Sequence, residues 1–212
     1  MGATRDRYSR SVFITCPFDD RYWPLFEALV FTVLACGFEP RCSLEEYDSG
    51  TVRLDKIKRL IRACGLAVHD LSRVESNRPH ALPRFNMPFE LGLDIGCRSF
   101  GLGRLRGKRL LVLDAERYRY QSILSDISGQ DIHTHRDSPQ ALIRTVRDWL
   151  RPAPSRRRVP GPLHIQRSYR QFARWLPDYC RKSGLDRRHL LFADYAAMAR
   201  EWIEAAREVE AA

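Results

Sequence analysis

Short apolar runs alternate with amphipathic stretches over the first 150 or so residues. Runs at residues 11–15, 66–69 and 108–113 are rich in aliphatic or β-branched side chains and predict three strands, and residues 38–43 predict a further, weaker strand. A shorter segment at residues 131–134 is a candidate fifth strand. Nearly continuous apolar runs are typical of strands that are buried on both faces of a parallel sheet.

Segments with the hydrophobic periodicity of helices lie between these strands and after the last of them. Apolar residues recur every three or four positions in four segments, which predict helices at residues 22–36, 51–64, 88–97 and 138–150. Gly37 and Gly65 are expected to end the first two helices, because glycine readily adopts the backbone conformation of a helix C-terminus. Ser138 is the predicted N-cap of the last helix, with Pro139 at its first position.

Strands that alternate with helices predict an α/β fold with helices on both faces of a parallel sheet. Right-handed crossovers from the first strand give the flavodoxin-like, doubly wound strand order 2-1-3-4-5. Ligands of such sheets bind beyond the carboxyl ends of the strands. This rule selects the loops that follow Thr15, Ser43, Val68 and Leu113.

The chain is expected to have three parts. Residues 1–151 form the α/β domain, residues 152–162 (PAPSRRRVPGP) have the composition of a linker, and residues 163–212 form a C-terminal helical hairpin. The hairpin carries apolar and aromatic stripes at helical spacing: Tyr169, Phe172, Leu176 and Tyr179, then Leu191, Tyr195, Met198 and Trp202. A hairpin cannot bury such stripes by itself, so we favour packing against the domain or another subunit over a ligand cage.

Composition indicates a soluble cytoplasmic protein. Apolar residues make up 44% of the chain, but no apolar run approaches the roughly 20 residues that span a bilayer. Residues 1–10 are polar and basic, without the apolar region of a signal peptide. The six cysteines form no C-x-x-C pair, so we expect reduced, mostly buried thiols and no metal site.

The net charge of +10 comes mainly from arginine and suggests an anionic partner. Nucleic acid is one such partner, but the densest basic run, at residues 156–158, lies in the predicted linker. An anionic small ligand is therefore favoured over nucleic acid.

Two of the selected loops contain carboxylates. In the loop that follows the first strand, Asp19 or Asp20 is expected to cap the next helix, while the other acid and Tyr22 face the cleft. Asp70 ends the third strand, where partial burial would raise its pKa and suit it to act as an acid. The alternative for Asp70 is a local turn that closes the strand.

Glu90 is the third candidate carboxylate. Pro88 is expected near the first helical position, which would put Glu90 in the first turn, where the helix dipole stabilises negative charge. A carboxylate at the mouth of a cleft can attack a sugar C1 carbon or stabilise an oxocarbenium ion. The alternative is an ordinary acidic residue in the first turn of a helix.

Together, Pro17-Phe18 after the first strand, Asp70 after the third, and Phe89-Glu90-Leu91-Gly92 resemble the nucleoside 2-deoxyribosyltransferase-like family, which is structurally akin to TIR domains. The resemblance covers about residues 11–150. It implies that Glu90 is the nucleophile or oxocarbenium stabiliser and that Asp70 donates a proton to the departing base. The candidate substrate-binding residues are Phe18, Asp19, Tyr22, Arg84 and Asn86.

The expected function is cleavage of an N-glycosidic bond, by hydrolysis or transfer, in NAD or another nucleotide. No cofactor is expected. The resemblance also suggests a homo-oligomer or effector-complex subunit, in a setting such as bacterial antiviral defence. A non-catalytic nucleotide-sensing or interaction module is the alternative. A phosphoacceptor receiver domain is disfavoured, because the fourth strand ends in Leu113-Asp114 and no lysine follows until Lys182.

Overall fold

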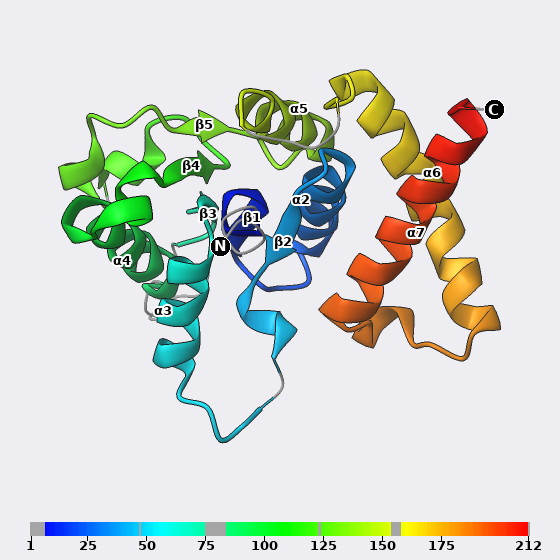
Figure 1. Cartoon of the computed structure of the whole chain (residues 1–212), viewed down its shortest axis with the longest axis horizontal. Coiled ribbons are helices and arrows are strands. Elements are labelled where there is room, and N and C mark those ends of the chain that lie inside the picture. The colour runs from blue at the N-terminus through cyan, green and yellow to red at the C-terminus, as the bar shows by residue number, and fades with distance from the viewer. Residues whose placement is uncertain (1–6, 47, 75–83, 123, 154–157, 212) are drawn as a thin grey trace.

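The computed structural model describes residues 7–46, 48–74, 84–122, 124–153 and 158–211 (Figure 1). Five parallel strands form one sheet in the order β2-β1-β3-β4-β5. The strands are β1 (Ser11–Thr15), β2 (Glu39–Arg41), β3 (Leu66–Asp70), β4 (Arg109–Asp114) and β5 (His133–Thr134). The predicted flavodoxin-like α/β architecture and its strand order are thus confirmed.

Helices connect the strands and follow the last of them. The α-helices are α2 (Trp23–Ala35), α3 (Arg53–Ala63), α4 (Asn86–Phe100), α5 (Pro139–Leu150), α6 (Pro162–Lys182) and α7 (Phe192–Ala211). Short 3₁₀ turns occur at Ser43–Glu45, Gly103–Gly107, Arg119–Ser122, Ser125–Ile127 and Arg187–His189. In the part of the chain that the structure describes, none of the helices combines the length and apolarity needed to cross a bilayer. Residues 154–157 of the predicted linker, and residues 75–83 of the loop after β3, lie outside the described ranges.

Side chains of the central strands divide between two helical layers. Val12 and Ile14 of β1 pack in one cluster with α2 and α5, whereas Phe13 packs with α3 on the opposite face. This alternation follows from the two-residue period of a strand. Because both faces are covered, all five residues of β1 are buried. The sheet edge formed by the carboxyl ends of the strands stays available for a site.

The C-terminal hairpin packs mainly against α2, which lies between most of the hairpin and the sheet (Figure 1). At one end, Arg200 of α7 pairs with Glu39 of β2. Phe172 of α6 stacks on Phe31 of α2, with ring centroids 5.4 Å apart. Arg187 pairs with Glu27 of α2 at 2.7 Å, and the Tyr195 hydroxyl donates to the Glu27 carbonyl at 2.8 Å. Every residue of α2 from Leu25 to Ala35 is therefore buried. The predicted packing role of the aromatic stripes is confirmed, although Leu191 remains largely exposed.

A buried ionic cluster joins α3, α4 and the start of β4. The Lys108 ammonium lies 3.0 Å from Asp94 and donates to the carbonyls of Ile61 and Cys64 at the end of α3. Asp94 also lies 3.1 Å from Nε2 of His69 on β3, and the side chains of Lys108, Asp94 and His69 are fully buried. A lysine whose ammonium group is buried away from solvent needs such partners, because an unpaired buried charge is strongly unfavourable.

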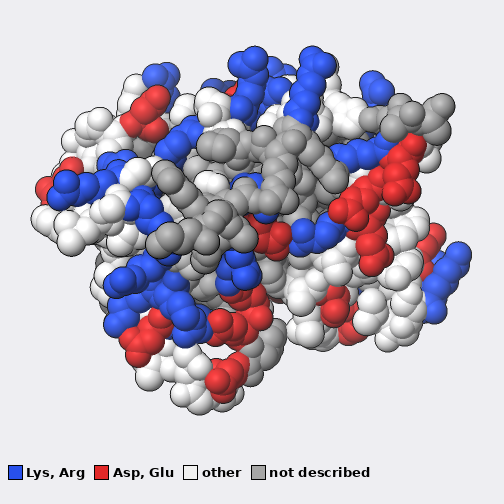
Figure 2. All heavy atoms as spheres, viewed as in Figure 1, with Lys and Arg blue, Asp and Glu red and all other residues white. Residues whose placement is uncertain are grey.

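Basic and acidic side chains are interspersed on the face drawn in Figure 2. The coloured part of this face shows no continuous basic band of the kind that follows a nucleic-acid backbone. The view thus adds no support for nucleic acid as the partner.

Candidate active site

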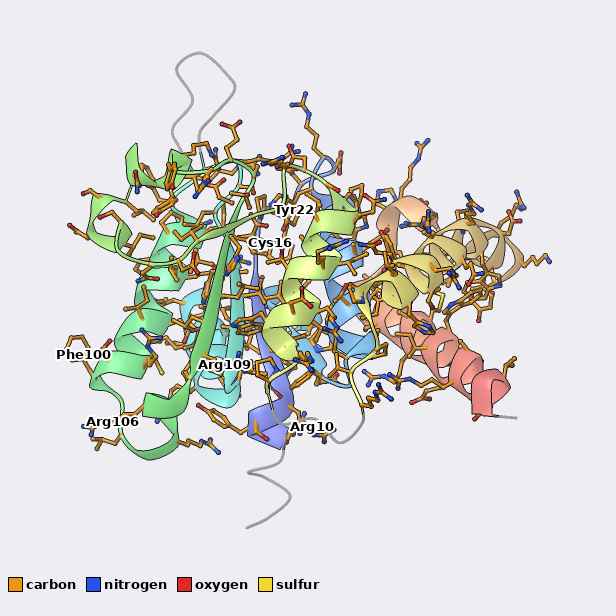
Figure 3. The ribbon with its side chains drawn as sticks, turned by 90° about the horizontal axis from the view of Figure 1, so that it is seen from above. Arg10, Cys16, Tyr22, Phe100, Arg106 and Arg109 are labelled. Atoms are coloured by element: carbon orange, nitrogen blue, oxygen red, sulfur yellow. The ribbon has the colours of Figure 1, made fainter. Side chains whose placement is uncertain are left out.

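A pocket of about 420 Å³ opens at the carboxyl end of β1, beside the start of α4. This is the sheet edge at which ligands of doubly wound folds bind. In Figure 3, Cys16 lies at this end of β1. The residues used in the argument below are Thr15, Phe18, Arg53, Arg84, Asn86 and Glu90, all of which line the pocket.

The local sequence explains why the chain turns away from the sheet at this point. Thr15 is the last residue of β1, and Cys16-Pro17 follows it. Proline has no N–H to donate to a strand ladder, so pairing stops and the chain leaves the sheet. Thr15 is consequently held at the strand end, where it lines the pocket.

Glu90 combines burial with access to this pocket. Glu90 is only 7% exposed, and its Oε2 accepts a short hydrogen bond from Oγ1 of Thr15. The predicted position in the first helical turn is wrong, because α4 begins at Asn86 and Glu90 is its fifth residue. Pro88 is accommodated at the third position, where a backbone N–H has no partner within the helix. Thr15, rather than the helix terminus, is therefore the direct partner of this carboxylate.

Arginines and aromatic rings surround Glu90. Arg53 and Arg84 contribute guanidinium groups to the lining, and Phe85 is a large exposed ring. The predicted binding residues Phe18, Arg84 and Asn86 all line the pocket.

Asp19 lies beside the pocket and holds Arg84 in place. Its two carboxylate oxygens accept from the backbone N–H of Tyr22 at 3.0 Å and from Arg84 at 2.5 Å. Burial raises the pKa of Asp19, but the hydrogen bonds from Arg84 and from the Tyr22 backbone outweigh burial and lower it. The predicted capping role is wrong, because the N-cap of α2 is Tyr22 and no side chain caps this helix; Asp19 instead accepts from the N–H of Tyr22, in the turn before α2. Among the described residues, Asp19 is not part of the pocket lining.

Asp70 occupies a different environment from Glu90. It is fully buried, and it accepts from the Tyr22 hydroxyl at 2.5 Å and from the Ser72 backbone at 2.8 Å, while His135 Nε2 lies 3.0 Å away. Burial raises the pKa of Asp70, but the bonds from His135, Ser72 and Tyr22 outweigh it and lower the pKa. The expected rise in its pKa is therefore wrong. Within the described part of the chain, neither Asp70 nor Tyr22 lines the Glu90 pocket.

Ser72, His135 and Asp70 are the residue types of a hydrolytic triad, but their geometry differs. In a triad the serine and the aspartate meet opposite nitrogens of the imidazole. Here Ser72 Oγ and Asp70 both lie 3.0 Å from Nε2, and Nδ1 accepts from the backbone N–H of Asp137. All three side chains are fully buried. The cluster therefore ties the end of β3 to the loop after β5 and presents no nucleophile.

Asp70→Asn is expected to reduce stability in a pH-dependent way. The folded-state pKa of Asp70 lies below the unfolded value of about 3.9. The carboxylate therefore stabilises the fold above that pH, and its contribution disappears as the pH falls through the folded pKa. In urea titrations the gap between wild type and variant should be wide at about pH 7 and should narrow toward about pH 3. Asp131→Asn, at a largely exposed side chain, is the control, and a gap independent of pH would contradict the assignment.

Sequence reasoning missed Thr15 and His135. Thr15 had a usable signal, since it is a hydroxyl residue at the carboxyl end of the first strand. His135 had none, because its partner Asp70 lies far away in the sequence and only the fold brings the two together.

Comparisons with protein-family models, curated proteins and solved structures find no match to this chain. The chemistry of the pocket therefore has to be argued from its own geometry. That geometry is a carboxylate with one oxygen held by a hydroxyl, beside two guanidinium groups and aromatic rings. Such a set of groups can stabilise a developing positive charge next to a phosphorylated sugar.

Proposed function

We propose that the chain cleaves the N-glycosidic bond of NAD or a related nucleotide, with Glu90 as the catalytic carboxylate. The observation that carries this proposal is that Glu90 lines the pocket while most of its surface is buried. A carboxylate that is shielded from bulk water interacts more strongly with a cation than an exposed one does. The oxocarbenium ion formed at a sugar C1 carbon is such a cation.

The proposed reaction breaks the bond between C1′ and the base nitrogen, whose electron pair departs with the base. Glu90 stabilises the resulting charge on the sugar, either electrostatically or by forming a bond to C1′. Because Thr15 occupies Oε2, Oε1 is the oxygen assigned to the sugar. Water then supplies the hydroxyl group at C1′, and its remaining proton goes to solvent.

The setting of Asp70 favours NAD among nucleotide substrates. Nicotinamide is cationic in NAD and leaves as a neutral molecule, so its departure needs no proton donor. A purine or pyrimidine leaves more readily when an acid protonates it. Asp70, the expected acid, is fully buried with a lowered pKa and lies outside the described lining of the pocket.

The remaining lining residues have complementary roles in this proposal. Arg53 and Arg84 bind the phosphates, since guanidinium groups form paired hydrogen bonds with phosphate oxygens. Phe85 offers an exposed ring for stacking against a base. The salt bridge to Asp19 keeps Arg84 oriented before the substrate arrives.

The proposal is tested by incubating purified protein with NAD, NADP and a panel of nucleoside monophosphates, and measuring free base by chromatography. We expect nicotinamide release from NAD to exceed base release from the monophosphates. A protein that binds NAD, as measured by calorimetry, but releases no base would favour the nucleotide-sensing module instead. A protein that neither binds nor cleaves any member of the panel would contradict both functions.

A further inference from the structure

A second pocket, of about 470 Å³, lies at the opposite end of the sheet from Glu90. Its walls come from the helical turn at residues 7–10, the end of α2, the start of β2 and one side of α7. Figure 3 shows Arg10 of this pocket at the other end of β1 from Cys16 and Tyr22. Because the two pockets flank opposite ends of the parallel strands, one small ligand cannot occupy both.

Positive charge predominates on the walls of this second pocket. Four arginines line it, against two glutamates: Arg7, Arg10, Arg200 and Arg207 face Glu39 and Glu204. Glu39 is already engaged by both terminal nitrogens of Arg200, at 3.0 and 3.1 Å. This pair cancels in charge, which leaves three arginines against Glu204 on the walls, one of which, Arg207, also donates to the Ala35 carbonyl. A cavity with excess guanidinium charge favours a phosphate-bearing ligand.

The rest of the lining is apolar. Leu34, Phe38 and Ile203 contribute to the walls and are each less than one-tenth exposed. A volume of this size is typical of small-molecule pockets, in which an apolar surface supplies affinity and a few polar groups fix the orientation. Inorganic phosphate alone would leave the apolar walls without a partner. The lining fits a molecule with both a phosphate and an apolar or aromatic part.

We propose that this pocket is a binding site for a small phosphorylated molecule whose apolar or aromatic part lies against Leu34, Phe38 and Ile203. The ligand bridges α7 of the hairpin and the start of β2, which Arg200 and Glu39 already connect. Binding to the folded state alone stabilises it by mass action. The ligand therefore raises the melting temperature of the protein and strengthens attachment of the hairpin. The site does not depend on the activity proposed for Glu90.

Phenyl phosphate is the probe, because it joins a phosphate to an aromatic ring and has no glycosidic bond to cleave. Titration calorimetry is expected to show saturable binding, accompanied by a rise in melting temperature. Inorganic phosphate should bind at least about tenfold more weakly, which corresponds to about 1.4 kcal/mol for the apolar contacts. Equal affinity for the two probes would overturn the amphipathic class of ligand, and absence of saturable binding would overturn the site.

Two exposed side chains allow opposite changes in pocket charge without disturbing the core. Arg7→Gln should weaken phenyl phosphate binding about tenfold, whereas Glu204→Gln should strengthen it several-fold by removing a repelling charge. Arg181→Gln, at an exposed arginine that lines neither pocket, is the matched control and should leave the affinity unchanged. Weakening by Arg53→Gln but not by Arg7→Gln would locate the ligand beside Glu90 and overturn the proposal.

Discussion

Glu90→Gln is expected to lower the rate of nicotinamide release from NAD by about 10³-fold or more, the scale on which loss of a nucleophile acts in enzymes. Glutamine has nearly the same shape as glutamate, and its amide oxygen can still accept the hydrogen bond from Thr15. What the variant lacks is the negative charge that faces the sugar cation. The measurement is single-turnover release of nicotinamide, followed by chromatography.

Control variants test whether the loss of activity is specific to the carboxylate of Glu90. Glu201→Gln, on an exposed position of α7, removes the same charge far from the pocket and should release nicotinamide at the wild-type rate. Thr15→Val should reduce the rate less than Glu90→Gln, and Thr15→Ser should restore it, because serine keeps the hydroxyl group. A Glu90→Gln protein that releases base as fast as wild type would exclude this carboxylate from the chemistry.

Asp94→Asn is expected to lower the free energy of unfolding by about 3–5 kcal/mol, the usual cost of removing one partner from a buried ion pair. Asp94 lies 3.0 Å from the Lys108 ammonium, and both side chains are fully buried. The variant would remove the negative charge that faces the lysine and leave its ammonium with neutral oxygens alone, such as the carbonyls of Ile61 and Cys64. Urea denaturation monitored by circular dichroism gives the change in free energy directly.

The matched comparison is Asp178→Asn, which removes one partner of the exposed Arg181–Asp178 pair and should change stability little. The double variant Asp94→Leu with Lys108→Met removes both charges but also takes these partners from His69 Nε2 and from the carbonyls of Ile61 and Cys64, so it should recover only part of the loss. Equal losses in Asp94→Asn and Asp178→Asn would show that the buried pair has no special importance.

The fold was predictable because hydrophobic periodicity and turn residues act locally. The run at residues 11–15 has apolar side chains at all three central positions, as expected of a strand covered on both faces, and Gly37 follows α2 in the left-handed conformation that glycine favours. The right-handed crossover rule then leaves few possible strand orders. The partner of the aromatic stripes was not predictable, because the stripes specify burial but not the surface that buries them.

The candidate site was predictable in position but not in its contacts. Asp70 and Glu90 both lie at the expected edge of the sheet. Whether a carboxylate faces a pocket or a buried histidine depends on side chains that are distant in sequence, such as His135 for Asp70 and Thr15 for Glu90. The start of α4 was predicted too late, because proline is accepted at the third helical position as well as at the first.

The burial of α2 on both sides has a consequence for biosynthesis. Its inner face packs on strands made before and soon after it, but its outer face is covered by α6 and α7, which are made after all five strands. During translation this apolar helix therefore presents an uncovered surface to other chains and to chaperones. A chain that ends before Phe172 because translation stalled would be able to form most of the sheet. The outer, apolar face of α2 would stay uncovered in this chain and would remain prone to aggregation.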